Sequence, residues 1–106
     1  MPKYLLKVCY TADGAKGVLK DGGTKRKQAA QALVESVGGK LESMYFAFGE
    51  TDVYAIADLP DNATAAAVSL ALGASATTTG TVTVLMTPEE VDQAAKKTVK
   101  YTPPGR

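Results

Sequence analysis

The sequence predicts an α+β fold of the βαββαβ type, with two main helices packed on one four-stranded antiparallel sheet. Four short segments are rich in the aliphatic, aromatic and β-branched residues that favour strands. Longer segments with helical spacing separate the first strand from the second and the third from the fourth. The chain has 106 residues, which is close to the commonest domain size. We therefore expect one domain over residues 3–97 and a basic C-terminal tail over residues 98–106.

The first strand is predicted over residues 4–10, where apolar residues stand between lysines. Thr11 is the expected cap of a short helical piece, in which Val18 and Leu19 should face inward. These elements would lead the chain from the sheet to the first main helix.

The first main helix is expected between two glycine pairs. Gly22–Gly23 interrupts the chain before it, and Thr24 is its expected N-cap. Its apolar residues follow the i, i+3, i+4, i+7 spacing of an amphipathic helix: Ala30, Leu33, Val34 and Val37. Gly38–Gly39 should end it, because glycine takes the left-handed conformation without steric cost.

The second half of the chain predicts a hairpin, a helix, a strand and a terminal helix. Strands over residues 41–48 and 52–58 are joined by a short loop that contains Gly49. Asp61 or Asn62 should cap an alanine-rich helix, and a strand over residues 77–86 follows. The segment Thr87–Glu90 (TPEE) has the pattern of a helix start, and that helix should reach Lys97.

This order of elements is that of the ferredoxin-like fold, in which right-handed crossovers place both main helices on one face of the sheet. The predicted strands nevertheless have apolar residues on both faces. One face of the first and last strands has Leu6, Val8, Val82 and Val84, and the other has Leu5, Cys9 and Leu85. We expect a second copy of the chain to cover the open face, in a homodimer or higher homo-oligomer.

The composition limits the chemistry. The chain has no histidine, which excludes imidazole bases and histidine metal ligands. Zinc and proximal-histidine haem sites are therefore not expected, and no cofactor is predicted. Cys9 is the only cysteine, so no internal disulfide can form, as is typical of cytoplasmic proteins. A net charge of +1 and short apolar runs favour neither nucleic acid nor a membrane as partner.

The hairpin is the first candidate site. It brings Glu50 and Asp52 close together, and crowding of like charges would let one carboxylate act as a general base. The same residues also suit a plain turn, in which Gly49 takes a positive φ and Asp52 accepts hydrogen bonds from nearby backbone N–H groups. We favour the turn, because Gly and Asp in hairpins usually serve geometry.

The segment 22–27 is the second candidate. Free backbone N–H groups and the positive end of a helix dipole would lie there, together with the cations Lys25, Arg26 and Lys27. An anion such as phosphate or carboxylate would fit, and Arg26 is the residue we expect to hold it through two hydrogen bonds. The favoured alternative is a solvated helix start with Asp21 as ion-pair partner.

Strand tyrosines form the third candidate. Tyr10, Tyr45 and Tyr54 can line a cavity between the sheet and the helices, where their hydroxyl groups would hydrogen-bond a ligand. Packing in the core or at an interface is the commoner role of such residues. Cys9 is expected to be a small buried apolar residue, because no histidine is present to activate its thiol.

Segments in a consistent order over about residues 3–95 resemble the GYD-domain family. They include Lys3–Thr11, Gly22–Gly23, Arg26, residues 34–42 (VESVGGKLE) and residues 45–52 (YFAFGETD). That family is similar to the dimeric α/β-barrel proteins, so the resemblance implies two ferredoxin-like sheets packed face to face in a homodimer. Gly49 and Asp52 match the Gly-Tyr-Asp hairpin of the family, whereas Thr51 stands where tyrosine is typical.

Three functions stay open after the sequence. The first is a homo-oligomeric domain that binds a small molecule between sheet and helices, with Arg26 or the Glu50/Asp52 hairpin at the mouth of the cavity. The second is a non-catalytic assembly module formed through the open sheet face. The third is an anion-responsive regulator that uses the segment 22–27. We favour the first two together and leave catalysis open.

Overall fold

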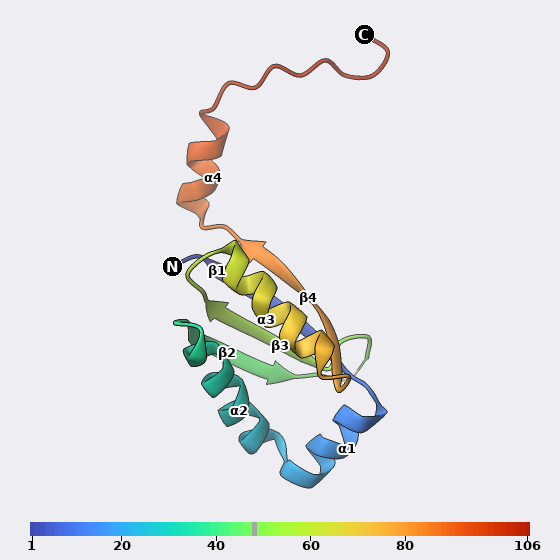
Figure 1. The fold of residues 1–106 in the computed structure, drawn as a ribbon. Coiled ribbons are helices and arrows are strands. Elements are labelled where there is room, and N and C mark those ends of the chain that lie inside the picture. Colours follow the sequence, from blue (N-terminus) through green and yellow to red (C-terminus); the bar gives the residue numbers. More distant parts are fainter. Residues whose placement is uncertain (48) are drawn as a thin grey trace.

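The computed structural model describes residues 1–47 and 49–106 and contains one four-stranded antiparallel sheet (Figure 1). The strands are β1 (Lys3–Tyr10), β2 (Lys40–Phe46), β3 (Val53–Asp58) and β4 (Thr78–Leu85), in the sheet order β2-β3-β1-β4. The helices are α1 (Ala12–Asp21), α2 (Gly23–Ser36), α3 (Asn62–Ala74) and α4 (Pro88–Ala95). This arrangement confirms the predicted α+β class and is consistent with the ferredoxin-like fold.

Side-chain caps begin three of the helices at the predicted residues. Thr11, Asp61 and Thr87 each accept a hydrogen bond from the backbone N–H three residues further on. At α4 the Glu90 side chain also accepts from the Thr87 backbone N–H, and Pro88 occupies the first helical position. The capping residues therefore fix the places at which α1, α3 and α4 leave the strands.

Two predictions about α1 and α2 are wrong. Thr24 does not cap α2, because Gly22 at φ 81° turns the chain and the helix begins at once at Gly23. Leu19 does not face inward and is 87% exposed, whereas Val18 is half-buried. Successive residues of a helix lie about 100° apart around its axis, so only one of these two neighbours can face the rest of the domain.

The predicted end of α2 is confirmed. Gly38 has φ 80°, and the N–H groups of Gly38 and Gly39 donate to the carbonyls of Glu35 and Val34. Gly39 also lies close to the end of β3, since a Cβ added to it would be 2.5 Å from the Asp58 carbonyl oxygen. The second strand was expected to reach Phe48, a residue outside the described ones, and β2 extends to Phe46.

The core lies between the helices and one face of the sheet. Leu6 pairs with Ala55 of β3 and with Val82 of β4 on this face. The buried core residues are Tyr4, Leu6, Val34, Ala55, Ala57, Leu59, Ala65 and Val68. Leu5 lies on the opposite face with its partners Ile56 and Thr83, so the two predicted faces are confirmed.

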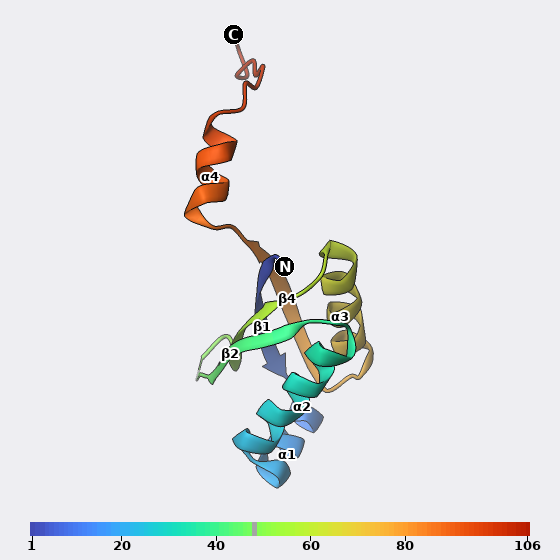
Figure 2. The same cartoon turned by 90° about the vertical axis from the view of Figure 1, so that its left-hand side faces the viewer.

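The end of the chain lies apart from the sheet and the helices α1, α2 and α3, which together form the body of the domain. Beyond β4, helix α4 and the tail extend away from the sheet in two perpendicular views (Figures 1 and 2). Within residues 1–47 and 49–106, no helix has the length and apolar character needed to cross a membrane.

Candidate functional site

An apolar cavity of about 100 Å³ lies between the sheet and the helices α2 and α3. Its lining from the sheet is Leu6, Val8, Tyr10, Leu41, Met44, Val53, Ala55 and Thr78. Its lining from the helices is Arg26, Ala29, Ala30, Leu33, Val34 and Leu72. The small side chains of Ala29 and Ala30 leave space where a longer residue on α2 would fill it.

Three polar side chains line the cavity, and they differ in how far they are already engaged. The Thr78 hydroxyl donates to the Leu72 carbonyl oxygen at 2.8 Å. Among the hydrogen bonds and ion pairs of the described residues, none engages the Tyr10 hydroxyl or the Arg26 guanidinium. These two groups are therefore the donors that the cavity offers to a ligand.

The hairpin holds Tyr10 in place through its backbone. The Asp52 carboxylate accepts a hydrogen bond from the Tyr10 backbone N–H at 2.8 Å, and the Asp52 N–H donates to the Val8 carbonyl. Gly49 has φ 140°, as the turn interpretation predicts. Asp52 thus serves the geometry at the end of β1, next to the cavity rather than inside it.

The cations of segment 22–27 do not form one cluster around a ligand. Lys25 lies 4.0 Å from Asp21 and is largely exposed, and Lys27 is also exposed. Arg26 is half-buried and lines the cavity. The predicted pairing with Asp21 is therefore present, and Arg26 belongs to the cavity instead.

Two other predicted residues, Tyr45 and Tyr54, lie on the open face of the sheet, which is the face without helices. Tyr45 and Tyr54 are cross-strand partners there, 71% and 40% exposed, and the Lys7 ammonium lies 6.0 Å from the centre of the Tyr54 ring. Lys3 is bonded to Glu42 at 2.9 Å and Asp58 at 3.0 Å, and these hydrogen bonds raise its pKa above the ordinary 10.5.

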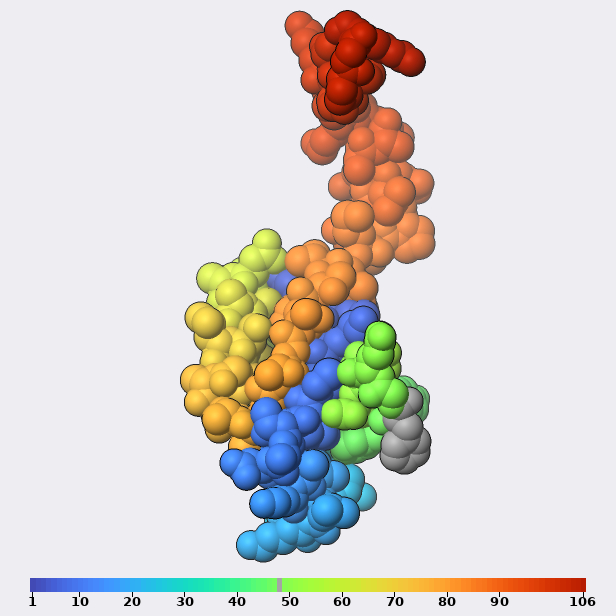
Figure 3. All heavy atoms as spheres, turned by 90° about the vertical axis from the view of Figure 1, so that its right-hand side faces the viewer, coloured from blue at the N-terminus to red at the C-terminus, as the bar shows by residue number. Residues whose placement is uncertain are grey.

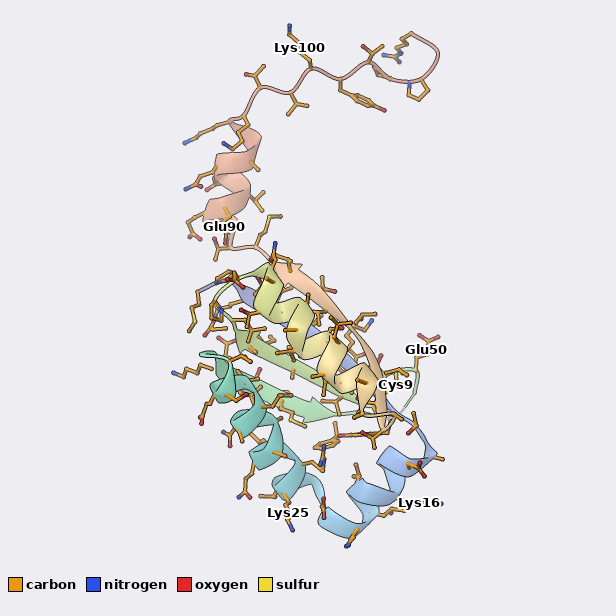
Figure 4. The ribbon with its side chains drawn as sticks, viewed as in Figure 1. Cys9, Lys16, Lys25, Glu50, Glu90 and Lys100 are labelled. Carbon is orange, nitrogen blue, oxygen red and sulfur yellow. The ribbon has the colours of Figure 1, made fainter. Side chains whose placement is uncertain are left out.

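A wider hollow of about 430 Å³ occupies one end of this open face. Its lining includes Lys7, Cys9, Glu50 and the segment Thr79–Thr81. The Cys9 thiol is half-buried and donates to the Glu50 carbonyl oxygen at 2.9 Å, and Figure 4 shows both residues at the same end of the sheet. Cys9 was expected to be buried, and it is partly accessible because it lies on the face without helices.

The structure thus divides the six predicted residues between two places. Tyr10 and Arg26 line the cavity and Asp52 supports it, while Tyr45, Glu50 and Tyr54 lie away from it. Thr78 was missed, although its even spacing from Val82 places it on the helix-covered face. In the described part of the chain, no three Cys, Asp or Glu residues gather where they could hold a metal ion.

The fold and the cavity define a class, a ferredoxin-like α+β domain with an apolar pocket between sheet and helices. The model of the GYD domain family matches residues 4–95 of the 106, so the chain belongs to the GYD domain family, as its resemblance indicated. No curated protein and no solved structure matches the chain.

Proposed function

We propose that this domain binds a small apolar molecule that carries one carboxylate, in the cavity between the sheet and α2 and α3. The observation that carries the proposal is the pairing of an apolar wall with two unengaged donors, the Tyr10 hydroxyl and the Arg26 guanidinium. Apolar pockets with a few convergent polar groups are the usual form of small-molecule sites. The guanidinium suits a carboxylate, because the two groups can form parallel hydrogen bonds.

The size of the cavity limits the ligand. An engineered apolar cavity of about 150 Å³ holds benzene, and this one has about 100 Å³. The apolar part of the ligand is therefore expected to be no larger than a single ring or a chain of a few carbons, with the carboxylate directed to Arg26. Benzoate and hexanoate are suitable test compounds of this class.

The lining favours binding over acid–base catalysis. Among its described residues the lining has no Asp, Glu, Lys or Cys side chain, which are common general acids and bases in enzymes. The carboxylates of Glu50 and Asp52 lie elsewhere, on the open face and at the Tyr10 backbone. The proposed activity is accordingly recognition of the acid.

Calorimetric titration with hexanoate and benzoate, and with hexanamide and benzamide, tests the proposal. We expect the acids to bind more tightly than the amides, and Ala30→Leu to abolish binding by filling the cavity. Ala32→Leu is the matched control, since Ala32 is exposed on the same helix. Equal binding by both variants, or no binding of any compound to the wild-type protein, would contradict the proposal.

Self-association through the open sheet face is a second proposal, favoured by a separate observation. Leu5, Ile56 and Leu85 are only half-buried there, and the exposed Tyr45 and Tyr54 lie on the same face. Figure 3 shows β4 and β1 at the surface with no helix above them. Lys3, Lys7 and Asp58 lie on the same face, and exposed apolar side chains bordered by polar ones are typical of a surface that pairs with another chain.

Sedimentation equilibrium distinguishes this pairing from an isolated monomer. We expect a dimer for the wild-type chain and a weaker dimer for Ile56→Lys, which puts a charge on the open face. Leu70→Lys is the control, because Leu70 is exposed on α3, which covers the other face of the sheet. A wild-type protein that stays monomeric at high micromolar concentration would end this proposal.

A further inference from the structure

Residues 86–106 form an arm that leaves the body at the end of β4. The arm comprises a two-residue connection, Met86–Thr87, followed by α4 and the tail. The described residues of the arm are exposed except Pro103, which is half-buried. Figure 3 shows the arm as a separate lobe, and Figure 4 places Lys100 far beyond the sheet.

The arm carries apolar side chains that are largely exposed to solvent. Met86, Val91, Val99 and Tyr101 are 62%, 49%, 79% and 72% exposed. In α4, Val91, Ala94 and Ala95 follow the i, i+3, i+4 spacing of one apolar stripe. Helices shorter than about 12 residues are marginal in water, and α4 has 8. A helix of this length needs a surface to pack against.

The exposed area is large enough for that surface to be another protein chain. The structure exposes 7490 Å², whereas a compact monomer of 11.0 kDa exposes about 5,600 Å². The excess is about 1,900 Å² per chain, more than the ~800 Å² that each partner buries in an interface of standard size. Two chains that each buried this excess would form an interface in the range of obligate homodimers, which is about 2,000–5,000 Å².

The direction of α4 takes the arm away from its own body. The capping box of Thr87 and Glu90 begins the helix two residues after β4 ends, and the helix axis then continues outward (Figures 1 and 2). The family match extends to residue 95, so α4 is part of the domain rather than an addition to it. One chain thus has both an arm with exposed apolar side chains and a sheet face that no helix covers.

We infer that two copies of the chain exchange their arms, so that α4 of each subunit packs on the body of the other. A twofold exchange covers both unpartnered surfaces with no third component. The inference rests on the proposed self-association and adds a specific interaction surface to it, the stripe of Val91, Ala94 and Ala95 with the apolar residues of the tail.

Chemical cross-linking of a mixture of ¹⁴N and ¹⁵N protein tests the exchange of arms in the full chain. Equal amounts of ¹⁴N and ¹⁵N protein are mixed, equilibrated and treated with an amine-reactive cross-linker. We expect mixed-isotope peptides that join the arm lysines, Lys96, Lys97 and Lys100, to lysines of the body. Arm-to-body links found only within one isotope would show that the arm folds back on its own chain, and would overturn the inference.

A substitution on the stripe provides the second measurement. We expect Val91→Asp to raise the dimer dissociation constant at least tenfold in sedimentation equilibrium, and Leu70→Asp on α3 to leave it unchanged. Arm exchange would be refuted if the Val91→Asp dimer were as tight as the wild-type dimer. If Ile56→Lys nevertheless weakened the dimer, pairing through the sheet face would still stand. A wild-type monomer would refute both.

Discussion

Arg26 is half-buried against an apolar cavity, while its neighbours Lys25 and Lys27 extend into solvent. A charged group that is taken from water without a partner is costly, so its environment favours the arrival of an opposite charge. Asp21, the acidic residue expected to pair with this segment, lies near Lys25 instead. Among single residues, Arg26 is therefore the one on which the proposed binding of an acid depends most.

Replacement of Arg26 should weaken the binding of acids but not the binding of their neutral amide analogues. We expect Arg26→Gln to weaken hexanoate binding about tenfold or more, because a hydrogen bond to a charged group contributes about 1.5–3 kcal/mol. Hexanamide binding should hardly change, and Lys25→Gln should leave both affinities as in the wild type. Calorimetric titration of the three proteins measures this, and a loss for hexanoate that is equal in the two variants would contradict the role of Arg26.

Tyr4 provides a test of the core next to this site. It is 1% exposed, and its hydroxyl donates to the Asn62 side-chain oxygen at 2.6 Å. We expect Tyr4→Phe to lower the free energy of unfolding by about 1 kcal/mol, the usual contribution of one such bond. Urea denaturation measures the change. Tyr101→Phe, in the exposed arm, should have no effect, and equal stabilities of Tyr4→Phe and wild type would show that the bond is not formed.

The residues of the candidate site could be predicted only in part, and Tyr45 shows why. Alternation from Leu41 would place Tyr45 on the same, helix-covered face. A register shift between Leu41 and Ser43 reverses the alternation, so Met44 faces the core and Tyr45 the open face. Nothing in the residue types at this point signals the shift. Tyr10, whose strand is regular, kept the position that its spacing predicts.

Among the secondary-structure elements, the N-terminus of α3 should lose stability as the pH falls. Two hydrogen bonds from Thr64, one from its hydroxyl at 2.7 Å and one from its N–H at 2.8 Å, hold the pKa of Asp61 below the ordinary 3.8. The stabilisation is therefore complete above the unfolded-state pKa and is lost as pH falls through the lower folded-state value.

Asp61→Asn should remove this pH dependence, since asparagine caps a helix but does not titrate. We expect the variant to match the wild type near pH 6 and to lose less stability than the wild type below about pH 4. Thermal unfolding followed by circular dichroism over that pH range checks it. If the two proteins lost stability equally as the pH falls, the Asp61 carboxylate would make no pH-dependent contribution to stability.

The junction of α2 and β2 depends on a close approach at Gly39. A Cβ there would lie 2.5 Å from the Asp58 carbonyl oxygen and 2.7 Å from Leu59 Cδ2. We expect Gly39→Ala to destabilise the fold by about 1–3 kcal/mol in urea denaturation. Gly17→Ala, which meets nothing within 4 Å inside α1, should instead stabilise it by about 0.5–1 kcal/mol. Destabilisation of equal size in both variants would contradict the role of the close approach at Gly39.

Elements with their own local signals could be predicted, and those set by tertiary packing could not. The caps at Thr11, Asp61 and Thr87 are present as expected, because a cap involves only residues near it in sequence. Thr24 is not a cap, since Gly22 bends the chain directly from α1 into α2. The separation of α4 from the body had no local signal, because it depends on how the chain leaves β4.

At the scale of the whole molecule, the chain is more extended than a compact domain of its length. Its radius of gyration is 16.9 Å, against about 13 Å for a compact chain of this size. The arm accounts for the long axis of 57 Å. If arms are exchanged, the dimer is the compact unit, and the cavity of each subunit lies between its own sheet and helices, away from the pairing face.

The methionine methyl groups report directly on whether the cavity binds a small apolar acid. The chain has three methionines; Met44 lines the cavity, whereas Met1 and Met86 are exposed. In a titration of ¹³C-methyl-methionine protein with hexanoate, followed by NMR, we predict that the Met44 signal moves and saturates while the Met1 and Met86 signals stay in place. A Met44 signal that does not move up to millimolar hexanoate, or that moves no more than the other two, would contradict the claim.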